Sequence, residues 1–158
     1  MRLSDLFTWP YFGQDALALR DYQDDEQAFA AVKRFFMAID GTSPILLFIS
    51  LVIPIVTSLF YHFAFNNKPG RHFRRHYRPR FLLIFWGASS LVTLIFSWVF
   101  EIIKVSLPPV DNNFSVFLFE VSLGAMCFGM FVYIVTSLVI GMTGKTNAYP
   151  LHKLFSKR

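Results

Sequence analysis

The chain has 158 residues, of which 54% are hydrophobic, 18% are aromatic and only 16% are charged. Soluble domains carry about 25% charged residues, and here the apolar residues gather in three blocks with almost no charge, a pattern that a single soluble core would not produce. The net charge of +5 is uneven, since residues 1–42 hold seven acids and four bases. In a membrane chain such asymmetry sets orientation, so it need not indicate nucleic-acid binding.

The first 43 residues are expected to form an extracytoplasmic arm rich in aromatic residues, followed by an amphipathic helix. Asp24 or Asp25 can cap this helix, which we expect to end near Ile39. Lys33 and Arg34 fall on its polar side, and its apolar side follows a helical 3-4-3 spacing of Phe29, Val32, Phe36 and Ile39. Such a helix lies in the membrane interface or docks on a soluble partner domain.

Three transmembrane helices are then predicted over residues 44–65, 79–103 and 115–141, which together make a domain of residues 44–141. Gly41 is expected to end the preceding helix, and Pro44 suits the first turn of a new one. Each apolar run is long enough to cross the roughly 30 Å hydrocarbon layer at 1.5 Å per residue. The fold class is therefore all-α integral membrane, with three transmembrane helices preceded by an amphipathic interfacial helix.

Small residues recur at four-residue spacing in the second and third of these spans. Small side chains at this spacing let two helix backbones approach closely within a membrane. The candidate packing positions are Ser89, Thr93 and Ser97 in the second span and Ala125, Gly129, Ser137 and Gly141 in the third.

A basic loop, residues 66–78, separates the first two spans, and residues 142–158 form a basic tail. The positive-inside rule places both in the cytoplasm and the N-terminus outside, most simply in a bacterial inner membrane. Basic clusters beside a span also attract anionic lipid or the acidic surface of a partner. The candidate contacts are Lys68, Arg71, Arg74, Arg75, Arg78 and Arg80. Binding of nucleic acid is disfavoured.

Two carboxylates fall within predicted spans, Glu120 about one turn into the third and Glu101 near the end of the second. An ionisable residue at membrane depth is a candidate functional group. Glu120 could line an ion or proton path, or pair with a cation of a neighbouring subunit. The simpler interpretation is that Glu120 is an interfacial residue near the helix N-terminus, satisfied by the helix dipole and by Lys104. Glu101 and Lys104 are three positions apart and can also pair.

No catalytic, cofactor or metal site is predicted. Cys127 is the only cysteine, so no zinc spacing exists. His72 and His76 share a helical spacing, but no carboxylate or cysteine near them completes a metal site. The sequence also lacks a P-loop, an HExxH motif and a nucleophile elbow.

The sequence thus predicts a non-catalytic accessory or assembly subunit of a larger membrane complex, such as secretion, transport or energy-transducing machinery. Its partners would be other membrane subunits, in a hetero- or homo-oligomer, and anionic lipid. One alternative is a homo-oligomeric pore, holin-like in its three-span layout. Its lining would come from two helix faces, Ser50 and Ser58 in the first span and Ser89, Thr93 and Ser97 in the second. The second alternative is a membrane anchor that binds anionic lipid through its basic loop.

Overall fold

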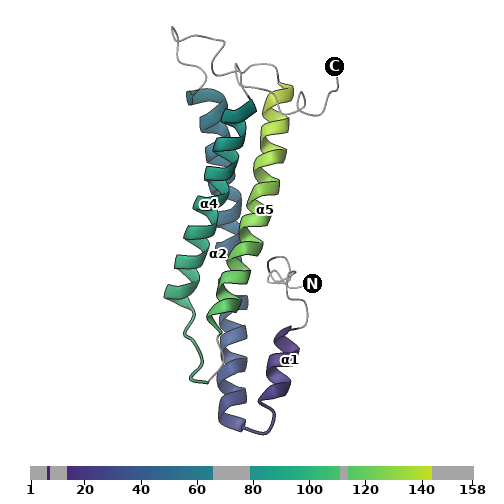
Figure 1. Ribbon diagram of the computed structural model, residues 1–158, viewed down its shortest axis with the longest axis vertical. Coiled ribbons are helices and arrows are strands. Elements are labelled where there is room, and N and C mark those ends of the chain that lie inside the picture. Colours follow the sequence, from purple (N-terminus) through teal and green to yellow (C-terminus); the bar gives the residue numbers. More distant parts are fainter. Residues whose placement is uncertain (1–6, 8–13, 66–78, 111–113, 144–158) are drawn as a thin grey trace. The chain divides into compact units, whose positions relative to one another are not determined.

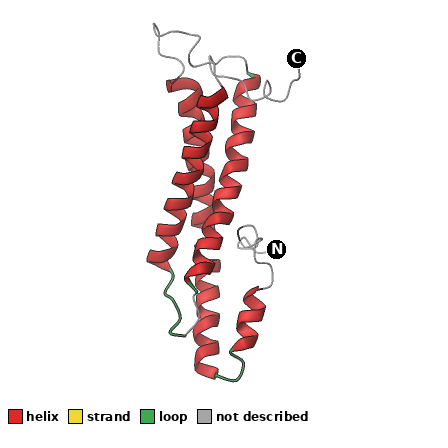
Figure 2. Ribbon diagram, viewed as in Figure 1, coloured by secondary structure: helices red, strands yellow, loops and turns green. Residues whose placement is uncertain are grey.

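The computed structural model describes Phe7 and residues 14–65, 79–110 and 114–143. Within these ranges every regular element is helical and none is a strand (Figures 1 and 2). The elements in chain order are α1 (Gln14–Asp21), α2 (Glu26–Leu59), the π-helix η3 (Phe60–Phe65), α4 (Pro79–Lys104) and α5 (Ser115–Met142). Three stretches, Glu26–Phe65, Arg80–Lys104 and Ser115–Met142, are long and apolar enough to cross a membrane, which confirms the all-helical, three-span prediction.

The helix α2 begins at an aspartate cap. Asp25 Oδ1 accepts hydrogen bonds from the backbone N–H groups of Gln27, at 3.0 Å, and Ala28, at 3.1 Å. These two donors have no partner inside the helix, so the carboxylate satisfies them. Of the two aspartates that the sequence offered as caps, Asp25 occupies this role.

The separate amphipathic helix and the break at residues 40–44 are wrong. α2 continues for 34 residues from Glu26 to Leu59, and the boundary expected between residues 43 and 44 falls inside it. Gly41 is exposed in mid-helix. The hydroxyl oxygens of Thr42 and Ser43 lie 2.7 and 3.3 Å from the Ile39 carbonyl oxygen, a back-bonding pattern that keeps both side chains within the helix.

The first turns of α2 still have the two faces that the sequence predicts. Val32, Phe35 and Ile39 are buried, while Lys33 and Arg34 are exposed. The apolar face packs against the chain itself, since the Phe35 ring meets the Phe114 ring edge-on at 5.2 Å. The position of these residues in the membrane interface stays a prediction.

The other two long helices end close to the expected residues. α4 starts at Pro79, where the missing N–H is harmless in a first turn, and ends at Lys104, one residue beyond the expected limit. α5 runs from Ser115 to Met142, again one residue longer than expected.

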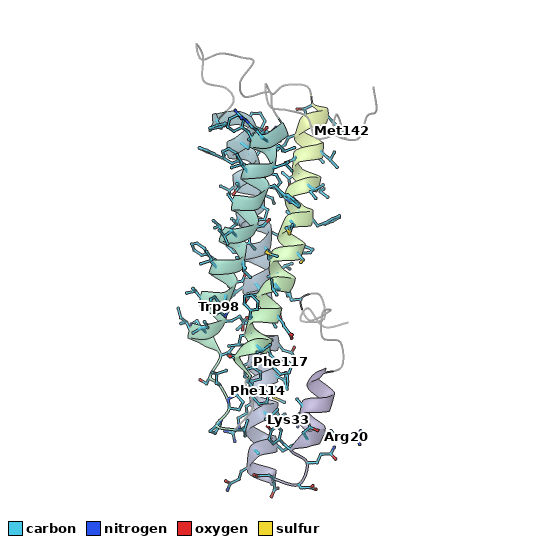
Figure 3. The ribbon with its side chains drawn as sticks, viewed as in Figure 1. Arg20, Lys33, Trp98, Phe114, Phe117 and Met142 are labelled. Carbon is cyan, nitrogen blue, oxygen red and sulfur yellow. The ribbon has the colours of Figure 1, made fainter. Side chains whose placement is uncertain are left out.

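The chain divides into two compact units, and each is described by itself. Unit 1 comprises Met1–Ile49 and Leu94–Met126. Aromatic rings link α2 to the start of α5, and Phe114 and Phe117, labelled in Figure 3, stack with centroids 5.7 Å apart. Trp98 of α4 meets Phe119 of α5 edge-on at the same separation, 5.7 Å.

Unit 2 comprises Ser50–Thr93 and Cys127–Arg158. Its core is built on three buried side chains, Tyr61, Leu82 and Tyr133. Six partly buried hydrophobic residues pack around them: Phe65, Phe81, Phe85, Trp86, Ile134 and Leu138. Tyr61 belongs to η3, where the widened turn follows the end of α2.

Candidate functional site

Glu101 is the most deeply buried ionisable residue in the described part of unit 1. Its side chain is 0% exposed. Its Oε1 lies 2.6 Å from Thr42 Oγ1, and so it joins α4 to α2 across 59 positions of sequence. Its Oε2 is buried and has no hydrogen-bond partner among the described residues.

The Thr42 hydroxyl therefore has two close oxygen neighbours. Besides Glu101 Oε1, it lies 2.7 Å from the carbonyl oxygen of Ile39, one turn earlier in α2. Both separations fall in the range of O–H···O hydrogen bonds. The Thr42–Glu101 contact joins a buried carboxyl group of α4 to a hydroxyl group of α2. In the described part of unit 1, no other buried carboxyl group contacts a polar group of another long helix.

The predicted partner of Glu101 was Lys104, and that pairing is wrong. Lys104 is exposed, and Thr42 is the only hydrogen-bonding side chain that the described residues bring to Glu101. Glu101 and Lys104 are three positions apart in α4, but the first side chain points into the protein and the second points to the surface. The burial of Glu101 against α2 separates it from Lys104.

The Glu120 side chain is less buried than the Glu101 side chain. It is half-buried on α5, and its Oε2 is enclosed without a hydrogen-bond partner in the described residues. Depth along the predicted span favoured Glu120 as the candidate functional group, whereas burial in the structure favours Glu101. The signal for Glu101 was the Thr42 hydroxyl, which cannot be matched to it without knowing how α2 and α4 pack.

The predicted packing positions lie mostly inside the fold. Ser89, Thr93, Ser97, Ala125, Gly129 and Ser137 are buried, and Gly141 is half-buried. Gly129 of α5 is closely approached by α2 and α4, because a Cβ on it would lie 3.2 Å from Pro54 Cγ and 3.3 Å from Thr93 Cγ2.

Hydroxyl groups link helices within unit 2. Ser58 Oγ and Ser137 Oγ are 2.9 Å apart, and both residues are fully buried. Thr93 donates instead to the Ser89 carbonyl of its own helix, at 2.9 Å. The Ser and Thr side chains therefore point into the protein.

Two features were missed by sequence reasoning. Gly124 of α5 faces Phe7, and a Cβ at Gly124 would lie 2.9 Å from Phe7 Cα. Tyr61 and His62, both fully buried, lie in the π-helix η3, an element that no sequence pattern indicated. For the Gly124–Phe7 contact, the available signal was a second glycine five residues before Gly129. No sequence signal marked the π-helix.

The whole basic loop, residues 66–78, lies outside the described residues, and with it lie Lys68, Arg71, Arg74, Arg75 and Arg78. Arg80 belongs to α4, is exposed, and holds its guanidinium carbon 5.1 Å from the centre of the Phe81 ring. Contact of these residues with anionic lipid or a partner stays a prediction.

No cluster of three or more His, Cys, Asp or Glu side chains suited to a metal ion occurs in the described ranges. Comparison with protein-family models, with curated proteins and with solved structures finds no match to this chain.

Proposed function

We propose that this chain is a non-catalytic integral membrane protein that serves as an accessory or assembly subunit of a larger membrane complex. The observation that supports the proposal is the apolar exterior of its three long helices. In their most apolar stretches only 28%, 28% and 33% of the residues are buried within the chain. Such helices need hydrocarbon or neighbouring helices around them, because large exposed apolar surfaces mark membrane or protein contacts.

The exterior of α4 illustrates this surface in unit 1. Ile95, Phe96, Val99 and Ile103 point outward together with Phe100 and, from α2, Ile49, and the six line an open cavity of about 380 Å³. No polar side chain contributes to that lining. Water would wet such a surface at a cost of about 25 cal/mol for each Å² of apolar area.

The direction of the hydroxyl groups favours a subunit over a homo-oligomeric pore. A pore between copies needs polar side chains on the outside of each copy, where they can meet water. Ser50, Ser58, Ser89, Thr93 and Ser97, the residues that would line it, are all buried in the chain. Their hydroxyls therefore support packing within one copy.

Orientation is part of the proposal. The basic residues between the first two spans and those of the C-terminal tail favour a bacterial inner membrane with the N-terminus outside and the C-terminus in the cytoplasm. A cysteine introduced at each end in a Cys127→Ala background, labelled by an impermeant thiol reagent on intact cells, tests this arrangement.

The decisive experiment for the function is purification of the tagged chain from its native membrane in mild detergent, followed by mass measurement of the intact assembly. One different protein at fixed stoichiometry is the expected result. A homo-oligomer alone, or a monomer alone, overturns the proposal. As a control, the chain made by itself in lipid vesicles is tested for dye leakage, which a subunit does not cause and a pore does.

A further inference from the structure

We propose that Glu101 is a proton-binding site: its carboxyl is held as the neutral acid and donates its hydrogen to Thr42, joining α4 to α2. The inference rests on hydrogen-bond geometry and burial in unit 1. It does not depend on the proposed subunit function.

The first step is a count of hydrogens around Thr42 Oγ1. That oxygen has one hydroxyl hydrogen to donate, yet it lies 2.7 Å from the Ile39 carbonyl oxygen and 2.6 Å from Glu101 Oε1. Two oxygens this close repel each other unless a hydrogen lies between them. The two contacts therefore need two hydrogens, and Thr42 supplies one.

The second step assigns the hydrogens. The Ile39 carbonyl can only accept, and donation from a threonine to the carbonyl one turn earlier is the usual helical arrangement. The Thr42 hydrogen is therefore directed to Ile39. The contact between Thr42 Oγ1 and Glu101 Oε1 is 2.6 Å long. We infer that its hydrogen belongs to Glu101, whose Oε1–H donates to a lone pair of Thr42 Oγ1.

The third step considers the other carboxyl oxygen of Glu101, Oε2. Oε2 is buried with no hydrogen-bond partner in the described part of the chain. An ionised carboxyl has about four lone-pair sites to satisfy, so an enclosed and unpaired oxygen would be costly. In the neutral acid Oε2 is a carbonyl oxygen, which tolerates burial far better.

Among the described residues of unit 1, no charged group offers a buried counter-charge to Glu101. On α2, Asp40 precedes Thr42 by two residues, and it is an acid; Lys33 and Arg34 are exposed. On α4, Lys104 is exposed, and on α5 the nearest ionisable group in unit 1 is the acid Glu120. α1 carries Arg20 and Asp21, both exposed. No basic side chain is buried in the described part of unit 1, so a bound proton is the available compensation.

The state without the proton follows directly. Loss of the proton leaves one hydrogen for two acceptors, so Thr42 can bond to Ile39 or to Glu101, but not to both. One of the two short oxygen–oxygen contacts then becomes repulsive, either Thr42–Ile39 within α2 or Thr42–Glu101 between α2 and α4. The presence of both short contacts at Thr42 is thus conditional on proton occupancy.

Infrared difference spectroscopy of the full chain in lipid vesicles tests the proposal. A protonated carboxylic acid has a carbonyl stretch that is separate from the bands of carboxylates and amides, and exposed Asp and Glu are ionised at neutral pH. The wild-type chain is expected to show this band at neutral pH and to shift it in heavy water. Glu101→Gln is expected to lose the band, and the matched variant Glu120→Gln to keep it.

Thr42→Val provides the second variant, because it removes the acceptor and leaves the acid. It is expected to move the band by freeing the O–H group, whereas Thr42→Ser leaves the band in place. Absence of the band from the wild-type chain, its survival in Glu101→Gln, or an unmoved band in Thr42→Val overturns the proposal. The wild-type and Thr42→Val spectra decide the matter even where Glu101→Gln fails to fold.

Discussion

Gly129 of α5 lies against Pro54 of α2 so closely that a Cβ in place of its hydrogen would be 3.2 Å from Pro54 Cγ. The same Cβ would be 3.4 Å from the Ser50 carbonyl oxygen, so the backbone of α2 limits how far the neighbours can yield. A Cβ at this position would require its neighbours in unit 2 to shift by a few tenths of an ångström, and a larger side chain would require more.

Gly129→Leu should therefore destabilise the protein by about 1–3 kcal/mol, the usual cost of overpacking a filled interior. The free energy of unfolding in detergent micelles, followed by the helical circular dichroism signal, measures the effect. Gly87→Leu is the matched control, since nothing lies within 4 Å of a Cβ at Gly87. Equal losses in the two variants would contradict the close contact.

Gly41→Ala should raise stability by up to about 1 kcal/mol, because alanine is the better helix former and α2 passes through this position. A Cβ at Gly41 meets nothing within 4 Å, so no packing cost opposes the gain. If a helix ended at Gly41, as the sequence suggested, alanine would instead be destabilising. The sign of the change in unfolding free energy separates the two structures.

The effects of Ser58→Ala and Ser137→Ala on the free energy of unfolding should be coupled. The two hydroxyl oxygens are 2.9 Å apart and buried, and hydrogen bonds between membrane helices contribute about 0.6 kcal/mol on average. A double-mutant cycle in unfolding free energy should return a coupling of that size. Additive losses would mean that the two hydroxyls do not interact.

Gly124→Val should displace Phe7, because a Cβ at this position would overlap the backbone of Phe7. In a Cys127→Ala background, Phe7→Cys places a reporter thiol at a site that is fully buried. The rate of thiol labelling should rise when Gly124→Val is added and stay low with Gly87→Val. An unchanged rate would show that Phe7 does not rest on Gly124.

The three long helices could be predicted because each depends on a local property, a long run of apolar residues with few charges. Pro79 at the start of α4 illustrates this, since proline at a first turn is a local signal that packing need not override. The all-helical fold follows from such signals alone.

The false break at Gly41 has a different origin. Gly, Ser and Pro in sequence are typical of a helix end followed by a restart, yet these preferences amount to about 1 kcal/mol for the glycine. Burial of Val32, Phe35 and Ile39 before the glycine, and of Leu46 after it, holds one continuous helix in place. Tertiary packing outweighs the local signals here.

The sequence identified Glu101 and Glu120 as candidate site residues, but it could not show which of the two is more deeply buried. Depth along a span can be counted from the sequence, whereas burial depends on which residue of another helix lies opposite. Thr42 is 59 positions from Glu101, and no spacing rule connects them. The partner of a buried polar group is a property of the packed helices.

The continuity of α2 has a mechanical consequence. Within unit 1 the exposed Lys33 and the buried Thr42 are nine positions apart on one unbroken helix, about 14 Å along its axis. Because one continuous helix carries both residues, a rotation of the segment around Lys33 about the helix axis would also move Thr42 relative to Glu101. A change at the exposed start of α2 would thus alter a hydrogen bond in the interior.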